Sequence, residues 1–96
     1  MPMTVVVTRD VADRYRGFLA SVMPEVAPGV FTSPELSRGV RERLWTVLGN
    51  WWSELPGGSI VMVWKDDGAP GRLGIASLGT PVRKLFDFDG VLVVAR

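Results

Sequence analysis

Short, almost continuously apolar runs alternate along this chain with longer segments in which apolar residues recur at helical spacing. The runs at residues 3–9 and 59–65 lack polar alternation, which is typical of strands buried on both faces. Residues 66–71 (DDGAPG) have the composition of a hairpin turn. The predicted strands are residues 3–9, 25–32, 59–65, 72–78 and 91–95, the second of them short and irregular around Pro28-Gly29.

The first helical segment follows the first strand. Asp10 is placed to cap its amino end, and Pro24 closes it. Apolar residues three and four positions apart indicate one face directed toward the core. That stripe consists of Val11, Tyr15, Phe18, Leu19 and Val22.

The second helical segment is the longest element that the pattern predicts. Ser33-Pro34-Glu35 has the features of a helix start: a hydroxyl cap, a proline in the first turn and an acid near the positive end of the helix. Pro56-Gly57-Gly58 ends it. Its predicted core stripe consists of Leu36, Val40, Leu44, Val47, Leu48, Trp51 and Leu55.

The order of these elements predicts one α+β domain over residues 1–96. Strand, helix, strand, helix and strand in succession fit a ferredoxin-like β-α-β-β-α-β sandwich, if the first and third strands are its middle strands. The strand at residues 91–95 is then extra. An extra terminal strand often pairs with the sheet edge of a second copy, so we expect an exchanged strand in a homodimer.

The composition narrows the chemistry. The chain has neither cysteine nor histidine, which excludes disulfides, the usual zinc sites and nucleophiles activated by histidine. Any catalysis would therefore use carboxylates, with a hard cation such as Mg²⁺. Hydrophobic residues make up 47% of the chain without forming a membrane-spanning run, which favours a protein interface. Because the amino terminus does not resemble a signal peptide, we expect a cytoplasmic protein that does not enter membranes.

Basic residues give the chain a formal net charge of only +1, and all of them except Lys65 and Lys84 are arginine. Arginine suits bidentate contacts with phosphate or carboxylate. A GC-rich genome explains the same preference equally well, so the bias alone does not establish a phosphate ligand.

Several segments, in order and at similar spacing, resemble one known family. They are MTVVVT (residues 3–8), RYRG (residues 14–17), EV (residues 25–26), GVF (residues 29–31), RERLW (residues 41–45), SIVMVW (residues 59–64) and FDFDGVLVV (residues 86–94). Together they resemble the small CRISPR-associated adaptation protein, the Cas-two family, in its I-E branch. No single motif is decisive, but the ordered set covers nearly the whole chain.

The resemblance implies a ferredoxin-like homodimer with exchanged carboxyl-terminal strands. In this family the dimer bridges two dimers of the spacer integrase and holds a duplex prespacer for insertion into a CRISPR array. Many members are described as Mg²⁺-dependent endonucleases. In the I-E branch the integrase subunit performs the insertion, so the resemblance implies a scaffold that needs no cofactor.

The resemblance also implies a set of DNA-backbone contacts. Arg14 and Arg16 match a basic pair in the first helix, and Arg38 matches a basic position near the start of the second. Arg83 and Lys84 lie close to a basic pair that precedes the family's DLDG-like segment, with spacing off by one or two residues. Without the resemblance, Arg14 and Arg16 would be read as solvated charges beside the core stripe. Contacts of this kind hold the phosphate backbone and do not read bases.

Asp10 is the candidate for catalysis and for a metal ion. Other branches of the family carry an acid here that is proposed to bind metal across the dimer axis. The I-E branch usually has an acid followed by an amide, whereas this chain has Arg9-Asp10. An arginine beside a lone carboxylate disfavours Mg²⁺ capture, so the competing interpretation is a helix cap.

Two tryptophans are candidates for a protein contact. Trp45 and Trp52 are expected on the side of the second helix opposite its apolar stripe, about 20° apart. An exposed aromatic pair suggests an interface with the second copy or with the integrase. The predicted interface residues are Trp45, Trp52, Val91, Leu92, Val93 and Val94.

Three other functions compete with the scaffold. A Mg²⁺-dependent endonuclease would act on RNA or DNA through Asp10 near the dimer axis. An RNA-binding module would stack bases on aromatic residues of its central strands, but residues 5–7 and 60–63 carry none. A small-molecule regulatory domain would need a polar pocket, for which no cluster of residues is evident.

Overall fold

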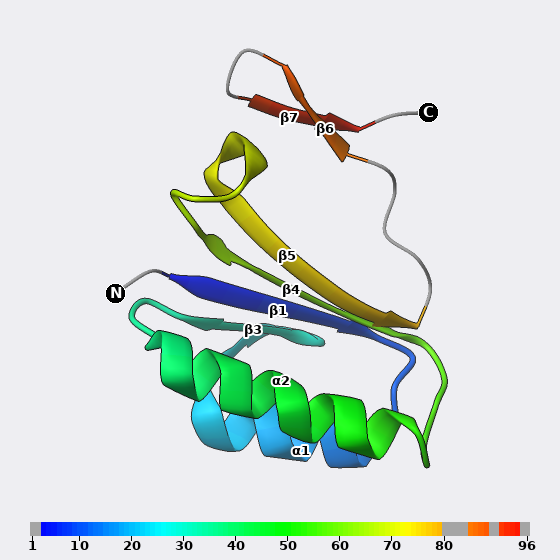
Figure 1. Cartoon of the computed structure of the whole chain (residues 1–96). Coiled ribbons are helices and arrows are strands. Elements are labelled where there is room, and N and C mark those ends of the chain that lie inside the picture. The colour runs from blue at the N-terminus through cyan, green and yellow to red at the C-terminus, as the bar shows by residue number, and fades with distance from the viewer. Residues whose placement is uncertain (1–2, 80–84, 89–90, 95–96) are drawn as a thin grey trace.

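In the computed structural model, which describes residues 3–79, 85–88 and 91–94, two helices cover one face of a five-stranded antiparallel sheet (Figure 1). The strand order is β2-β3-β1-β4-β5, with β1 in the centre. The order β2-β3-β1-β4, with one helix after β1 and one after β3, is that of a ferredoxin-like sheet. The elements are β1 (Thr4–Arg9), α1 (Asp13–Val22), β2 (Glu25–Ala27), β3 (Val30–Ser33), α2 (Arg38–Trp52), β4 (Ser59–Lys65) and β5 (Leu73–Gly79). The α+β prediction is therefore confirmed.

The predicted strand at residues 25–32 is two strands. β2 and β3 pair with each other across a turn at Pro28-Gly29, and Gly29 has the left-handed φ of 75° that glycine adopts easily. This hairpin supplies two strands of the ferredoxin-like sheet. The strand predicted at residues 72–78 therefore becomes a fifth strand, β5, beside β4.

One face of the central strand packs under the helices. Thr4, Val6 and Thr8 of β1 are buried there, and Val6 lies opposite Phe31 on one neighbour and Met62 on the other. The alternate residues point to the other face, where Val7 is 42% exposed. The apolar run predicted burial on both faces, whereas the described part of one chain covers only the helix side.

The start of α2 differs from the prediction. Ser33 ends β3, and the helix begins at Arg38 after Ser37, whose Oγ accepts a hydrogen bond from the backbone N–H of Val40 at 3.2 Å. Because α2 begins later than predicted, the set of α2 residues that faces the core also differs from the predicted stripe. Leu44 and Leu48 are buried as expected, but Arg41 joins them, and Val40 and Leu55 are each 38% exposed.

The carboxyl-terminal segment forms a separate two-stranded sheet. β6 (Leu85–Phe88) and β7 (Val91–Val94) are antiparallel, and Leu85 lies opposite Val94. The predicted last strand therefore exists, but it pairs within its own chain with β6, a strand that the pattern did not predict. The exchange of this strand between two copies is not tested in a single chain and stays a prediction.

The core lies between the sheet and the two helices. Its members are Val6, Tyr15, Leu19, Met23, Phe31, Leu36, Leu44, Leu48, Ile60 and Met62. No helix in the described residues is long and apolar enough to cross a membrane.

Candidate nucleic-acid interface

Arg14 lies on the exposed side of α1. Its guanidinium carbon is 4.3 Å from the ring centroid of Trp51, near the end of α2. Phe18 and Tyr15 hold that ring edge-on, with centroids 5.1 and 5.9 Å away. A cation stacked on a fixed ring keeps its position but still faces water. The Arg14 side chain is therefore already ordered, so binding an anion costs it little further conformational entropy.

Tyr15 fixes the two helices to each other under this stack. The side chain is fully buried, and its hydroxyl donates a 2.7 Å hydrogen bond to the backbone carbonyl of Leu55 just beyond α2. Burial raises the pKa of Tyr15 above 10.0, while the nearby Arg14 charge acts in the opposite direction. The hydrogen bond and the burial explain why Trp51 stays in place beneath Arg14.

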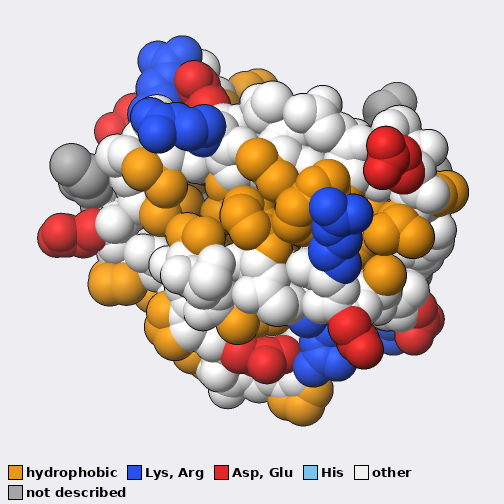
Figure 2. Space-filling view, turned by 90° about the horizontal axis from the view of Figure 1, so that it is seen from below, with side chains coloured by type: hydrophobic (Ala, Val, Ile, Leu, Met, Phe, Trp, Pro, Cys, Tyr) orange, Lys and Arg blue, Asp and Glu red, His pale blue; other side chains and the backbone are white. Residues whose placement is uncertain are grey.

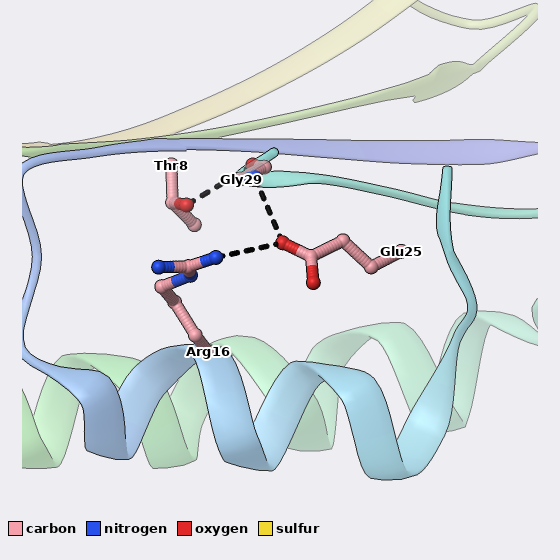
Figure 3. Close-up of polar contacts among 4 residues, drawn as sticks. All are labelled: Thr8, Arg16, Glu25 and Gly29. Atoms are coloured by element: carbon pink, nitrogen blue, oxygen red, sulfur yellow. Dashed lines mark hydrogen bonds and ion pairs between the residues drawn. The ribbon is translucent and has the colours of Figure 1, made fainter. Parts of the chain in front are cut away.

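Arg16, two residues after Arg14 on the same helix, forms an ion pair within the chain (Figure 3). Its guanidinium is 3.2 Å from Oε2 of Glu25, and the same oxygen accepts a 2.8 Å hydrogen bond from the backbone N–H of Gly29. Thr8 completes the cluster, because both its backbone N–H and its hydroxyl donate to the Gly29 carbonyl. The Gly29 hydrogen bond, and then Arg16, lower the pKa of Glu25. Arg16 thus helps to hold the β2–β3 hairpin.

Asp10 is exposed on the rim of a hollow of about 250 Å³ that Thr8, Val11, Arg16 and Gly29 also line. The predicted helix cap at Asp10 is wrong. The cap position of α1 is Ala12, which makes no side-chain cap hydrogen bond, and Asp10 adopts a left-handed φ of 55° in the preceding loop.

Asp10 does not belong to a cluster of potential metal ligands within the described residues. No three carboxylates gather there, and the other charged residue that lines this hollow is the cationic Arg16. One carboxylate beside a guanidinium does not match the several oxygen ligands of Mg²⁺. The described part of one chain does not fit the metal, so we derive no catalytic step from it.

The other predicted DNA contacts do not join Arg14 in one cluster. Arg38 is paired with Glu42 at 2.9 Å, and this contact lowers the pKa of the carboxylate. Arg38 begins α2 whereas Trp51 is near its end, so the two basic positions are about 20 Å apart along the helix. Arg83 and Lys84 lie outside the described residues.

The two candidate interface tryptophans are half-buried and pack against the core. Trp52 lies 5.8 Å from Tyr15, so the prediction of an exposed pair opposite the core stripe is wrong. The reason is the rotated stripe of α2, which turns Trp45 and Trp52 toward the sheet. Their role as a protein interface is not tested and stays a prediction. The side chains of Val91, Leu92, Val93 and Val94 lie outside the part of the chain whose side chains are described.

The outer surface of the helix layer carries an apolar band, which Figure 2 shows from the helix side. Part of it is a groove of about 240 Å³ between α1 and α2. The groove is lined by Phe18, Val22, Val40, Arg43, Leu44 and Val47. Basic and acidic side chains lie around the band, so this surface is not uniformly cationic.

Arg41 is the charged residue that sequence reasoning missed. It is only 9% exposed, and its guanidinium lies 4.4 Å from the Trp64 ring centroid. The segment RERLW contains it, but the predicted core stripe of the second helix included only apolar residues. The spacing Arg41, Leu44, Trp45 and Leu48 was the available signal, because residues three and four apart share a helix face.

Comparison with known protein families agrees with this fold. A family model described as "CRISPR-associated protein (Cas_Cas2CT1978)" matches residues 3–93, which include every strand and helix of the sandwich. The resemblance noted in the ordered motifs is thereby confirmed over nearly the whole chain. The chain therefore belongs to this family of CRISPR-associated Cas2 proteins.

Proposed function

We propose that the chain is the scaffold subunit of a CRISPR adaptation complex, in which a homodimer bridges integrase dimers and binds the backbone of duplex prespacer DNA. The observation that carries the DNA-binding part is Arg14. It is exposed, stacked on Trp51 and paired with no carboxylate among the described residues. Membership of a CRISPR-associated family supplies the biological setting.

The uncovered sheet face supports a dimer. Val5, Val61 and Val63 alternate with the helix-facing residues, and Val63 lies opposite both Val5 and Ile75. This surface is apolar and only half-buried in one chain. Because large exposed apolar patches mark interaction sites, a second copy would cover it well. A dimer carries two copies of Arg14, one for each phosphate backbone of a DNA duplex.

Backbone contacts explain how such a dimer can accept prespacers of different sequence. Arginine binds phosphate through charge and a planar fork of donors, and phosphates carry no base identity. Arg16 and Arg38 have internal carboxylate partners at 3.2 and 2.9 Å, so DNA would have to compete with Glu25 and Glu42 for them. Arg14 has no such competitor within the described residues and is the first residue to test.

The test is assembly with the integrase subunit of the same CRISPR system, measured by light scattering with and without a splayed DNA duplex. We expect two copies of this chain to four integrase subunits. Arg14→Gln should weaken the DNA-bound assembly and leave the protein-only contacts intact. Lys65→Gln is the control, because it removes one exposed positive charge at the end of β4.

Two further variants separate the parts of the proposal. Val63→Glu places a charge on the uncovered sheet face, and we expect it to convert the dimer to a monomer. Asp10→Asn should leave spacer integration unchanged. Loss of integration with Asp10→Asn, together with Mg²⁺-dependent cleavage by the unaltered chain alone, would replace the scaffold with the endonuclease alternative.

A further inference from the structure

Arg41 has no carboxylate partner, although most of its side chain is buried. The residue is 9% exposed on the sheet-facing side of α2, and its guanidinium makes no ion pair or hydrogen bond with a described side chain. The guanidinium nitrogens are not themselves fully buried, so the charged tip keeps contact with solvent beside the Trp64 ring. The buried stem and the ring therefore hold a free charge in one place at the surface.

Trp64 holds the guanidinium in one place. Its indole lies against Gly74 of β5, where any larger side chain would collide with the ring. The indole Nε1–H is buried and also lacks an acceptor among the described residues. The indole N–H thus faces Gly74, whereas the guanidinium of Arg41, over the ring, stays open to a ligand.

Arg41 and Trp64 line two neighbouring hollows. One, of about 580 Å³, lies between the start of α2 and the end of β4. The other, of about 410 Å³, has the apolar residues Trp45, Met62 and Ala76 in its walls, with Glu42 and Thr46 beside them. A ligand at Arg41 can therefore place a negative group on the guanidinium and an apolar group in the second hollow. Fixed tryptophan and arginine side chains around a pocket are typical of anchor sites in protein interfaces.

The charges around the larger hollow distinguish between possible ligands. Arg38 is paired with Glu42, and Lys65 with Asp67 at 3.9 Å. Asp66 also lines this hollow. Arg41 is thus the cation of this hollow without a carboxylate partner in the described part of the chain. The free guanidinium suits one anionic group. The apolar residues of the neighbouring hollow favour a protein side chain beside that group over a nucleic-acid backbone.

We propose that Arg41 and Trp64 anchor a protein segment that bears one carboxylate close to an apolar side chain. The carboxylate accepts hydrogen bonds from the Arg41 guanidinium, and the apolar side chain occupies the hollow bounded by Trp45, Met62 and Ala76. This site needs no nucleic acid, so it extends beyond the proposed DNA contacts. It also gives Trp45 an interface role as the wall of a pocket.

The test uses the unaltered full chain labelled with ¹⁵N and the peptide acetyl-Leu-Ala-Glu-amide. Residues two apart in an extended peptide point the same way, so Leu and Glu can reach both hollows. The reporters are the Arg41 Nε–H and Trp64 Nε1–H resonances. We expect both to shift in a saturable manner at up to about 10 mM peptide, a concentration that reveals weak binding.

Two control peptides and one control variant define the outcome. Replacing Glu with Gln in the peptide should weaken binding roughly tenfold or more, because a charge-assisted bond is lost. Replacing Leu with Ala should weaken it a few-fold, about the effect of a smaller buried apolar side chain. Arg43→Gln in the protein should change nothing, since Arg43 lines the groove on the other side of α2.

Three results would overturn the proposal. They are the absence of saturable shifts, equal binding of the Glu and Gln peptides, and shifts of both resonances with a DNA duplex but not with the peptide. The last would assign the site to phosphate. Because the main measurement uses the unaltered chain, no outcome depends on a destabilised variant.

Discussion

Two arginine–tryptophan stacks of almost equal geometry occur in this protein, Arg14 over Trp51 at 4.3 Å and Arg41 over Trp64 at 4.4 Å. The first lies on the outer side of the helix layer, where Arg14 is exposed. The second lies between α2 and the sheet, where Arg41 is 9% exposed. The two stacks have nearly equal guanidinium-to-ring distances but differ in solvent exposure. We therefore expect the Arg14 charge to be able to bind a polyanion, and the Arg41 charge to bind only a ligand that fits its hollow.

The surroundings of the two rings explain the difference. Trp51, on α2, packs against Tyr15 and Phe18 of α1, and Arg14 of the same helix lies over its ring. Trp64 is held between Arg41 on one side and the backbone at Gly74 on the other. Substitutions near the exposed stack should therefore be tolerated, whereas the position of Trp64 in the buried stack requires a residue without a side chain at position 74.

The largest expected effect is at Gly74. A Cβ added there would meet the Trp64 indole, so Gly74→Ala should lower the free energy of unfolding by about 1–3 kcal/mol. Gly17→Ala is the control near the exposed stack. Its Cβ would meet nothing within 4 Å, so it should raise stability by about 0.5–1 kcal/mol. Urea unfolding at one fixed protein concentration measures both. Equal effects would show that Trp64 is free to move.

The next effect separates the two arginines. Arg41→Ala should lower the free energy of unfolding by about 1–2 kcal/mol, because the stem of a buried side chain is lost from the packing. Arg14→Ala should stay within about 0.5 kcal/mol, as is usual for an exposed residue. The same urea titrations give both values. A larger loss for Arg14 than for Arg41 would contradict the assignment of the buried and exposed stacks.

For DNA binding, unlike stability, the Arg14 variant should have a larger effect than the Arg41 variant. A dimer that loses Arg14 loses two phosphate contacts, so Arg14→Gln should reduce the slope of log K against log salt by about 1.8. Arg41→Gln should leave that slope unchanged, because Arg41 is only 9% exposed and lies between α2 and the sheet. Fluorescence anisotropy with a labelled duplex at several salt concentrations measures the slope. An equal reduction by both variants would place the DNA on both stacks.

The smallest effect is a shift in the titration of Tyr15, the chain's single tyrosine. Burial holds its pKa above the unfolded value of 10.0, so its contribution to stability is complete below pH 10.0 and is lost as the pH rises through the folded pKa. The Arg14 charge lowers this pKa, so Arg14→Gln should move the absorbance titration to still higher pH. Arg41→Gln should not move it. A shift with Arg41→Gln but not Arg14→Gln would contradict the contact between the two helices.

Sequence reasoning succeeded where one kind of residue dominates a segment. The runs at 3–9 and 59–65 became β1 and β4 with nearly the predicted bounds, because continuous valine and isoleucine favour strands in almost any context. It failed at residues 25–32, where Pro28-Gly29 was treated as an irregularity and proved to be a turn. A short turn and an irregular strand share the same composition, and only pairing with β1 separates them.

The candidate site was less predictable than the fold. Arg14 was identified, and its exposed position is as expected, but its partner Trp51 was assigned to the core. Arg16 was expected to contact DNA, which stays a prediction, but its ion pair with Glu25, nine residues away, was not foreseen. Both contacts join residues of different elements. No spacing rule within one element could have revealed them.

The amino-acid sequence by itself determined the α+β class, the strands β1, β4 and β5, the family and the absence of cysteine and histidine chemistry. Tertiary structure alone decided the start of α2, the side on which Trp45 packs, and the burial of Arg41. The physical reason is that arginine and tryptophan each have a long apolar part and a polar tip. Such residues suit either side of an amphipathic helix, and the surface that they meet across the core selects one.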